Sequence, residues 1–158
     1  MMRMRSRAPY VAIVLASLAG LATATRASAA LGEPAASVSA DERLLSAVRR
    51  TSTARGAYTI ERLDSTASTV REFVAPSGVV FAVAWGGVSR PDLSVLLGSY
   101  ATPYHRALAQ SAPTSRRRSR RVESGGVVVE TWGHMRAQHG RAYVPALIPP
   151  GVTLDELE

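Results

Sequence analysis

The chain has 158 residues, of which 46% are hydrophobic and 20% are charged, and its formal net charge is +7. This balance is typical of a globular domain and excludes disordered, collagen-like and multi-span membrane proteins. All 19 basic residues are arginine, and the sequence contains no lysine, cysteine or asparagine. Without lysine or cysteine, the chain has no Schiff-base or thiol chemistry, no iron–sulfur cluster and no disulfide.

The first 29 residues have the three parts of a secretory signal peptide. Three arginines lie within Met1–Arg7, an apolar run follows over 8–24, and Ala27–Ala29 forms a small-residue cleavage site. No adjacent arginine pair precedes the run, which favours the general secretory route. We therefore expect a periplasmic or secreted protein cleaved near Ala29; the alternative is an uncleaved N-terminal anchor.

Cleavage after Ala29 leaves 129 residues, which is the size of one domain over 30–158. It also removes four arginines and lowers the formal charge to +3. The basic character of the remaining chain then lies mainly in one run, within the loop 111–121.

The first part of this domain is predicted to begin with a short helix, which strands then follow. Ser39–Glu42 reads as a capping box, and the leucines after it predict a short helix that ends near Arg49 and Arg50. Alternation over Tyr58–Leu63 predicts a strand. Two β-rich runs, 69–74 and 79–85, flank a Pro-Ser-Gly turn and predict a hairpin.

The second strand of that hairpin is apolar on both faces, which predicts a central position in the sheet. Alternation assigns its side chains to two faces. One face is expected to carry Val79, Phe81, Val83 and Trp85, and the other Val80, Ala82 and Ala84. The face of small residues is expected to let a helix pack closely.

Helices are predicted next. Ser89–Asp92 supplies an N-cap, an early proline and a first-turn carboxylate for a helix over 93–100. Pro103 interrupts the pattern, and a second short helix is predicted over 104–110.

The last third is predicted to hold a flexible, arginine-rich loop and further strands. The loop covers 111–121, and strands follow over 127–132 and 136–143. Thr153, with the acidic residues after it, is expected to cap a final turn. The predicted fold is a single α+β domain, an antiparallel sheet of about five strands with one or two helices packed on one face.

Three long stretches, Glu72–Trp85, Pro91–Tyr100 and Gly133–Leu147, resemble the bacterial domain-of-unknown-function family 2844. The resemblance covers nearly all of the chain after the signal peptide. It implies a small exported protein without an assigned activity, cofactor or catalytic residue. The arginine-rich loop is peculiar to this sequence and is not part of the resemblance.

The segment from Trp132 to Tyr143 is the candidate ligand-binding site. Its residues are Trp132, His134, Arg136, His139, Arg141 and Tyr143. His139, Arg141 and Tyr143 share one strand face and suit a carboxylate, a phosphate or a sugar acid; the alternative is an ordinary solvated sheet surface. We expect no metal site, because His134 and His139 point to opposite faces of an unbroken strand.

The arginine run is a candidate patch for an anionic surface. It consists of Arg116, Arg117, Arg118, Arg120 and Arg121. No aromatic residue is interleaved with it, so nucleic-acid binding is not expected. The alternative is a solvated loop.

These features predict an exported, noncatalytic accessory module of the cell envelope that binds a protein partner or a polar or anionic ligand, without a cofactor. The alternative is a small cofactor-independent hydrolase of envelope sugars or esters. Glu61, Glu72 and Glu130 on predicted strands supply carboxylates for it, but no Gly-x-Ser-x-Gly motif is present. A cleft with two converging carboxylates or a Ser–His pair would favour the hydrolase.

Overall fold

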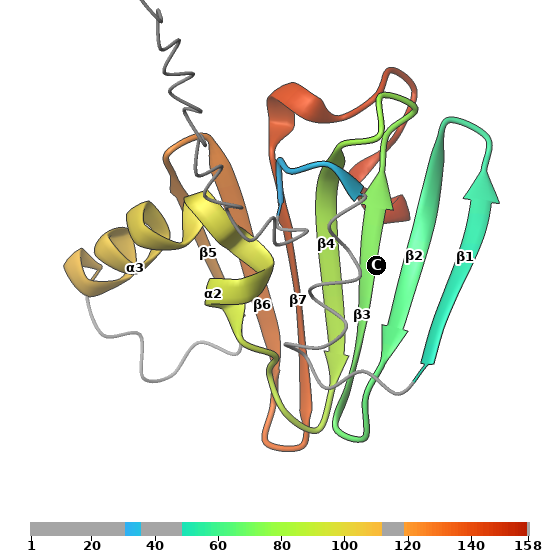
Figure 1. The fold of residues 1–158 in the computed structure, drawn as a ribbon. Coiled ribbons are helices and arrows are strands. Elements are labelled where there is room, and N and C mark those ends of the chain that lie inside the picture. Colours follow the sequence, from blue (N-terminus) through green and yellow to red (C-terminus); the bar gives the residue numbers. More distant parts are fainter. Residues whose placement is uncertain (1–30, 36–48, 112–118, 158) are drawn as a thin grey trace, which may run out of the picture.

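A computed structural model describes residues 31–35, 49–111 and 119–157. Its described part is mainly one seven-stranded sheet, in which all neighbouring strands are antiparallel (Figure 1). The strands are β1 (Arg49–Arg55), β2 (Tyr58–Asp64), β3 (Ser68–Val74), β4 (Val80–Gly87), β5 (Ser119–Ser124), β6 (Val127–His134) and β7 (Ala137–Tyr143). Their order is β1-β2-β3-β4-β7-β6-β5, so two meanders meet along β4 and β7.

One helical stretch carries the chain from β4 to the far edge of the sheet at β5. It comprises α2 (Leu93–Leu97), the 3₁₀ turn η2 (Gly98–Tyr100) and α3 (Ala101–Gln110). Two further 3₁₀ turns, η3 (Pro145–Leu147) and η4 (Leu154–Glu156), follow β7. Among the described helices, none is long and apolar enough to cross a membrane.

The predicted fold class is wrong. The fold is strand-rich, with seven strands where about five were expected, and its main helical part is a single stretch of 18 residues. The two strands that the sequence did not reveal are β1 and β5, which form the two edges of the sheet. Arg49 and Arg50, expected at a helix end, belong to β1; the rest of that expected helix lies outside the described residues. Ser119–Arg121, expected in a loop, begins β5.

The helical stretch buries its apolar side chains against one face of the sheet. Asp92 caps α2 by accepting a hydrogen bond from the backbone N–H of Ser94 at 2.8 Å. Leu96 and Leu97 are fully buried in a cluster that includes sheet residues such as Trp85. Figure 1 shows α2 and α3 at the β5–β6 end of the sheet.

Pro103 does not interrupt the helix as expected. It lies in the first turn of α3, which begins at Ala101. Backbone N–H groups in a first helical turn have no partner within the helix, so the missing N–H of proline costs little there.

The C-terminal segment covers the opposite face. Leu157 is fully buried in a second cluster with the aromatic rings of Tyr58, Phe73 and Phe81. Thr153 and Glu156 form a capping box at η4, which confirms the predicted final cap. The Tyr58 hydroxyl donates a hydrogen bond to Glu156 Oε2 at 3.0 Å and ties this segment to β2.

The hairpin predicted over 69–74 and 79–85 is confirmed as β3 and β4, but the facing of β4 differs from the prediction. The register shifts between Phe73 and Val74, where a bulge interrupts the alternation. Phe81 therefore shares a face with Ala82 and belongs to the second cluster. The helices pack on the other face, over Val83, and not on the face of small residues.

Candidate functional site

The six predicted ligand-binding residues lie on the β6–β7 hairpin. Trp132 pairs with His139 across the hairpin, and His134 pairs with Ala137, so a two-residue loop, Met135–Arg136, joins the strands. This hairpin is flanked by β5 on one side and by β4 on the other. The site residues therefore sit where the two meanders meet: His134, Arg136 and His139 lie at the end of the sheet where β4 finishes, and Tyr143 lies opposite Ala82, towards the start of β4.

Two of the predicted residues, Arg141 and Tyr143, belong to a network of ion pairs and hydrogen bonds around Glu130. Arg141 Nε donates to Glu130 Oε2 at 2.7 Å, and Arg121 Nη1 donates to Glu130 Oε1 at 2.6 Å. Arg141 Nη1 also donates to the backbone carbonyl of Leu154 at 2.6 Å, and Arg121 Nη1 donates to the hydroxyl of Tyr143 at 3.3 Å. Arg141 thus links the sheet to the C-terminal segment, and both Arg141 and Tyr143 have polar partners within the protein.

The charge state of Glu130 follows from this network. Burial alone would raise the pKa of Glu130, but the hydrogen bonds and positive charges of Arg141 and Arg121 outweigh it, and the pKa lies below its usual value. The carboxylate is therefore ionised at neutral pH and balances the arginine pair.

Trp132 and His139 form a neighbouring aromatic pair. Their ring centroids are 6.3 Å apart and the planes are inclined by 15°. The guanidinium carbon of Arg141 lies 5.9 Å from the Trp132 ring centroid, which is within range of a cation–π contact. His139 is exposed and lies over Gly86 of β4, where a Cβ would come within 2.7 Å of its Nδ1.

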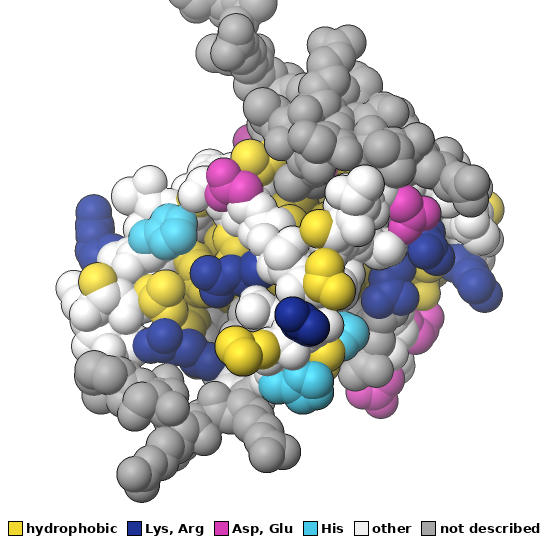
Figure 2. Space-filling model, turned by 90° about the horizontal axis from the view of Figure 1, so that it is seen from below, with side chains coloured by type: hydrophobic (Ala, Val, Ile, Leu, Met, Phe, Trp, Pro, Cys, Tyr) yellow, Lys and Arg dark blue, Asp and Glu magenta, His cyan; other side chains and the backbone are white. Residues whose placement is uncertain are grey.

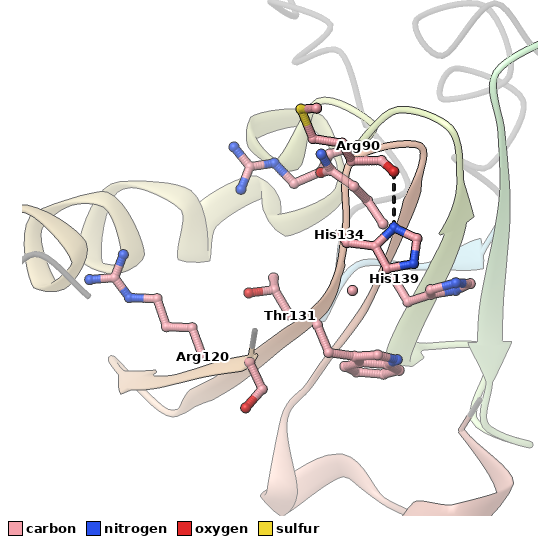
Figure 3. A pocket seen from close by; sticks show the side chains of 10 residues that line it. Arg90, Arg120, Thr131, His134 and His139 are labelled. Carbon is pink, nitrogen blue, oxygen red and sulfur yellow. Dashed lines mark hydrogen bonds between the residues drawn. The ribbon is translucent and has the colours of Figure 1, made fainter. Parts of the chain in front are cut away.

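An open pocket of about 290 Å³ lies beside this pair. The residues that line it are Arg90, Ser119, Arg120, Thr131, Trp132, Gly133, His134, Met135, Gln138 and His139. Figure 3 shows Arg90 and Arg120 on one side of the pocket, with Thr131 between them and His134 and His139 opposite. The side chains come from β5, β6, β7 and the loop after β4.

This pocket is basic. No aspartate or glutamate is among the residues that line it. Within the described part of the chain, Arg90 and Arg120 take part in no ion pair, whereas Arg121 and Arg141 do. Burial raises the pKa of Tyr104 on α3, and the positive charges of Arg90 and Arg120 oppose that rise. Both guanidinium groups thus act on the same hydroxyl, which places them in one electrostatic environment.

The remaining predicted residues are spread over the hairpin end. His134 lines the pocket, and its Nδ1 is 2.9 Å from the backbone oxygen of Met135. Arg136 lies at the exposed tip and is not among the lining residues.

The arginine patch expected from the sequence is divided in the structure. Arg120 lines the basic pocket, and Arg121 binds Glu130. Arg116, Arg117 and Arg118 lie outside the described residues.

A second open pocket, of about 330 Å³, contains a Ser–His contact. Ser94 Oγ on α2 lies 3.3 Å from His105 Nε2 on α3, and both side chains are exposed. Arg90 lines this pocket as well. In the described ranges, no group of three His, Cys, Asp or Glu side chains is placed to hold a metal ion.

Sequence reasoning missed the residues that complete the basic pocket, above all Arg90. Arg90 lies three residues after the end of β4, and β4 pairs with β7, with Gly87 opposite Gln138. This long-range pairing brings Arg90 to the hairpin, and no local pattern encodes it.

Comparison with known proteins gives one assignment. No curated protein and no solved structure matches the chain. The model of a family described as "Protein of unknown function (DUF2844)" matches residues 27–157, in agreement with the resemblance seen in the sequence. The chain belongs to the DUF2844 family.

Proposed function

We propose that this protein is an exported, noncatalytic binding module that holds an anionic ligand in the basic pocket at the β6–β7 hairpin. The observation that carries the proposal is the pair Arg90 and Arg120, two guanidinium groups without an ion-pair partner in the described chain, on one pocket that has no lining carboxylate. Guanidinium groups bind carboxylates and phosphates through paired hydrogen bonds.

The other lining side chains fit such a ligand. Ser119, Thr131 and Gln138 offer neutral hydrogen-bond donors, and the partly exposed Trp132 offers an apolar surface. A pocket of about 290 Å³ is near the lower end of the usual range for small-ligand sites. The ligand class is therefore a small anion or a small molecule that carries a carboxylate or a phosphate.

Export is part of the same proposal. It is supported by the charged start, the apolar run over 8–24 and the small residues at Ala27–Ala29. Mass spectrometry of the protein recovered from the periplasm should give an N-terminus at Ala30 or Leu31. Recovery of the intact Met1 terminus would contradict cleavage.

Ligand binding is tested by calorimetry with phosphate, acetate and glucuronate. Arg90→Ala and Arg120→Ala should each weaken the best of these ligands about tenfold, because each removes one charge-assisted contact. Arg106→Ala, at an exposed arginine of α3 that lines neither of the two pockets described, is the matched control and should bind as the wild type does. A double variant, Arg90→Ala with Arg120→Ala, that binds as tightly as the wild type would refute the site.

The hydrolase alternative has one observation in its favour, which is the Ser94–His105 contact. In that role Ser94 Oγ would attack an ester carbonyl while His105 accepts its proton and then gives it to the departing alcohol; water would hydrolyse the acyl-serine. Hydrolysis of p-nitrophenyl acetate and covalent labelling of Ser94 by a fluorophosphonate test this role. Both should be lost in Ser94→Ala and retained in Ser89→Ala. Equal turnover by Ser94→Ala and the wild type would exclude it.

A further inference from the structure

The tip of the β6–β7 hairpin presents apolar side chains to solvent. Met135 in the hairpin loop is 88% exposed, and Val88, just after β4, is 57% exposed. Gly87 of β4 pairs with Gln138 of β7, and the backbone N–H of Val88 donates to Ala67. These pairings place both apolar side chains at the same end of the sheet.

The hairpin loop has an unfavourable backbone at its tip. Two-residue hairpin loops favour Asn-Gly or Asp-Gly, because positive φ angles are needed, but this loop is Met135–Arg136. Arg136 has φ +68°, the only positive φ of a non-glycine residue among those described. An arginine held in this conformation at an exposed tip is the kind of strain that accompanies function. A long cationic side chain thus stands at the one loop position where glycine would relieve the strain.

Arginines flank the apolar tip. Arg136 lies next to Met135 in the loop, and Arg90 follows Val88 after one residue. Figure 2 looks at the molecule from this end and shows arginine, histidine and apolar side chains mixed over its centre, with acidic side chains towards the margin. Met135, His134 and Arg90 also line the basic pocket, so the tip and the pocket form one continuous surface.

We propose that this end of the molecule docks on anionic phospholipid bilayers. Met135 and Val88 enter the headgroup region, Arg136 contacts the lipid charge, and Arg90 and Arg120 bind a headgroup phosphate in the basic pocket. The inference rests on the proposed anion binding and names the source of the anion. Apolar side chains that project singly between arginines fit an interface with anionic lipid, where burial and charge both contribute. A protein partner would be expected to meet a wider apolar patch with aromatic anchors.

Vesicle binding tests the inference. The exported protein is sedimented with phosphatidylcholine vesicles, with or without phosphatidylglycerol, and in parallel titrated with inorganic phosphate while Trp132 fluorescence is followed. We expect binding only to vesicles that contain phosphatidylglycerol, and weaker binding at high salt. Arg136→Ala should weaken it about fivefold, since each cation near an anionic surface contributes about that factor.

The decisive variant is Val88→Ser, because Val88 is exposed and does not line the basic pocket. Vesicle binding should fall about fivefold as apolar contact is lost, while the phosphate response of Trp132 is kept. Leu147→Ser is the matched control, because Leu147 is 37% exposed in η3 at the other end of β7. Undiminished vesicle binding by Val88→Ser would overturn the docking surface.

Two further outcomes separate this inference from the proposed function. Phosphate binding without vesicle binding overturns membrane docking and leaves the anion pocket standing. If the wild type binds neither phosphate nor vesicles, the membrane docking and the anion pocket are both overturned. Binding to pure phosphatidylcholine as tight as to the anionic vesicles would also contradict the inference, because no role would remain for the arginines.

Discussion

Glu130 connects three parts of the structure through its two carboxylate oxygens. One oxygen accepts a hydrogen bond from Arg121 on β5 and the other accepts one from Arg141 on β7. Arg141 also donates to the backbone carbonyl of Leu154 in the C-terminal segment. Its side chain is 16% exposed, so the loss of its charge would leave Arg141, which is 14% exposed, without its ionic partner. We expect Glu130→Gln to lower the free energy of unfolding by about 2 kcal/mol at neutral pH, measured by urea denaturation.

Glu123→Gln is the matched control, because Glu123 is 71% exposed and its nearest contact with Arg121 is 3.8 Å. Exposed pairs of this kind contribute about 0–1 kcal/mol. Equal effects of the two substitutions would show that the Glu130 network does not stabilise the fold.

The same carboxylate predicts a pH dependence of stability. Because the folded pKa of Glu130 is lowered, its contribution is complete above the ordinary glutamate pKa of about 4.3 and is lost as pH falls through the lower folded value. Wild type and Glu130→Gln should therefore differ most near neutral pH and converge in acid. Denaturation curves over a pH series measure this, and a difference that grows on acidification would contradict the assignment.

Gly140 is needed for close packing between strands. A Cβ at this position would come within 2.3 Å of the Trp85 ring and 2.7 Å of the Glu130 backbone oxygen. We expect Gly140→Ala to lower the free energy of unfolding by about 2 kcal/mol through overpacking. Gly86→Ala is the control, since the nearest atom there belongs to the exposed His139 ring, which can rotate. If the two variants had the same melting temperature, the Trp85 ring would be able to move aside for the added Cβ.

Among single residues, the sequence predicted some site positions and not others. Trp132, His134 and His139 line the basic pocket, but Arg141 and Tyr143 are engaged within the protein. Residue type alone does not show this, because the partners of Arg141 come from β6 and from the C-terminal segment.

The C-terminal segment is an element that closes one face of the sheet. Leu157 is fully buried against the aromatic cluster, and Tyr58 holds Glu156 from β2. Leu157→Ala should cost about 3 kcal/mol, the usual range for a buried leucine, in chemical denaturation. Leu147→Ala, at a partly exposed position of η3, should cost much less. If both variants unfolded at the same denaturant concentration, Leu157 would not be a core residue.

Elements with a strong apolar pattern were predictable from the sequence. The β3–β4 hairpin, the helices after Asp92 and the strand β6 all bury several apolar side chains. The edge strands β1 and β5 were missed, because an edge strand buries few side chains and can therefore form with few apolar residues. In β5, only Val122 is buried. The bulge beside Phe73 was also not predicted, since the alternation of side chains between the two faces of a strand does not show where a bulge interrupts it.

In the whole molecule, the pocket depends on the junction between the two meanders. Pairing of β4 with β7 sets the loop that carries Arg90 beside the hairpin, and β5, which flanks the hairpin along β6, brings Arg120 to the same pocket. Local sequence patterns predict the strands but not this order, which joins residues about fifty positions apart. The fold therefore assembles a basic pocket from two arginines that no local sequence pattern brings together.

The central claim is that this pocket binds anions, and amide chemical shifts recorded during a phosphate titration test it most directly. Saturable shifts are predicted for the amides of Thr131, Gly133, His134 and Gln138, with no change at Thr153–Leu157. The same shifts should be absent in the variant that combines Arg90→Ala with Arg120→Ala. Amide shifts that never saturate, or that are the same in this variant, would contradict the account.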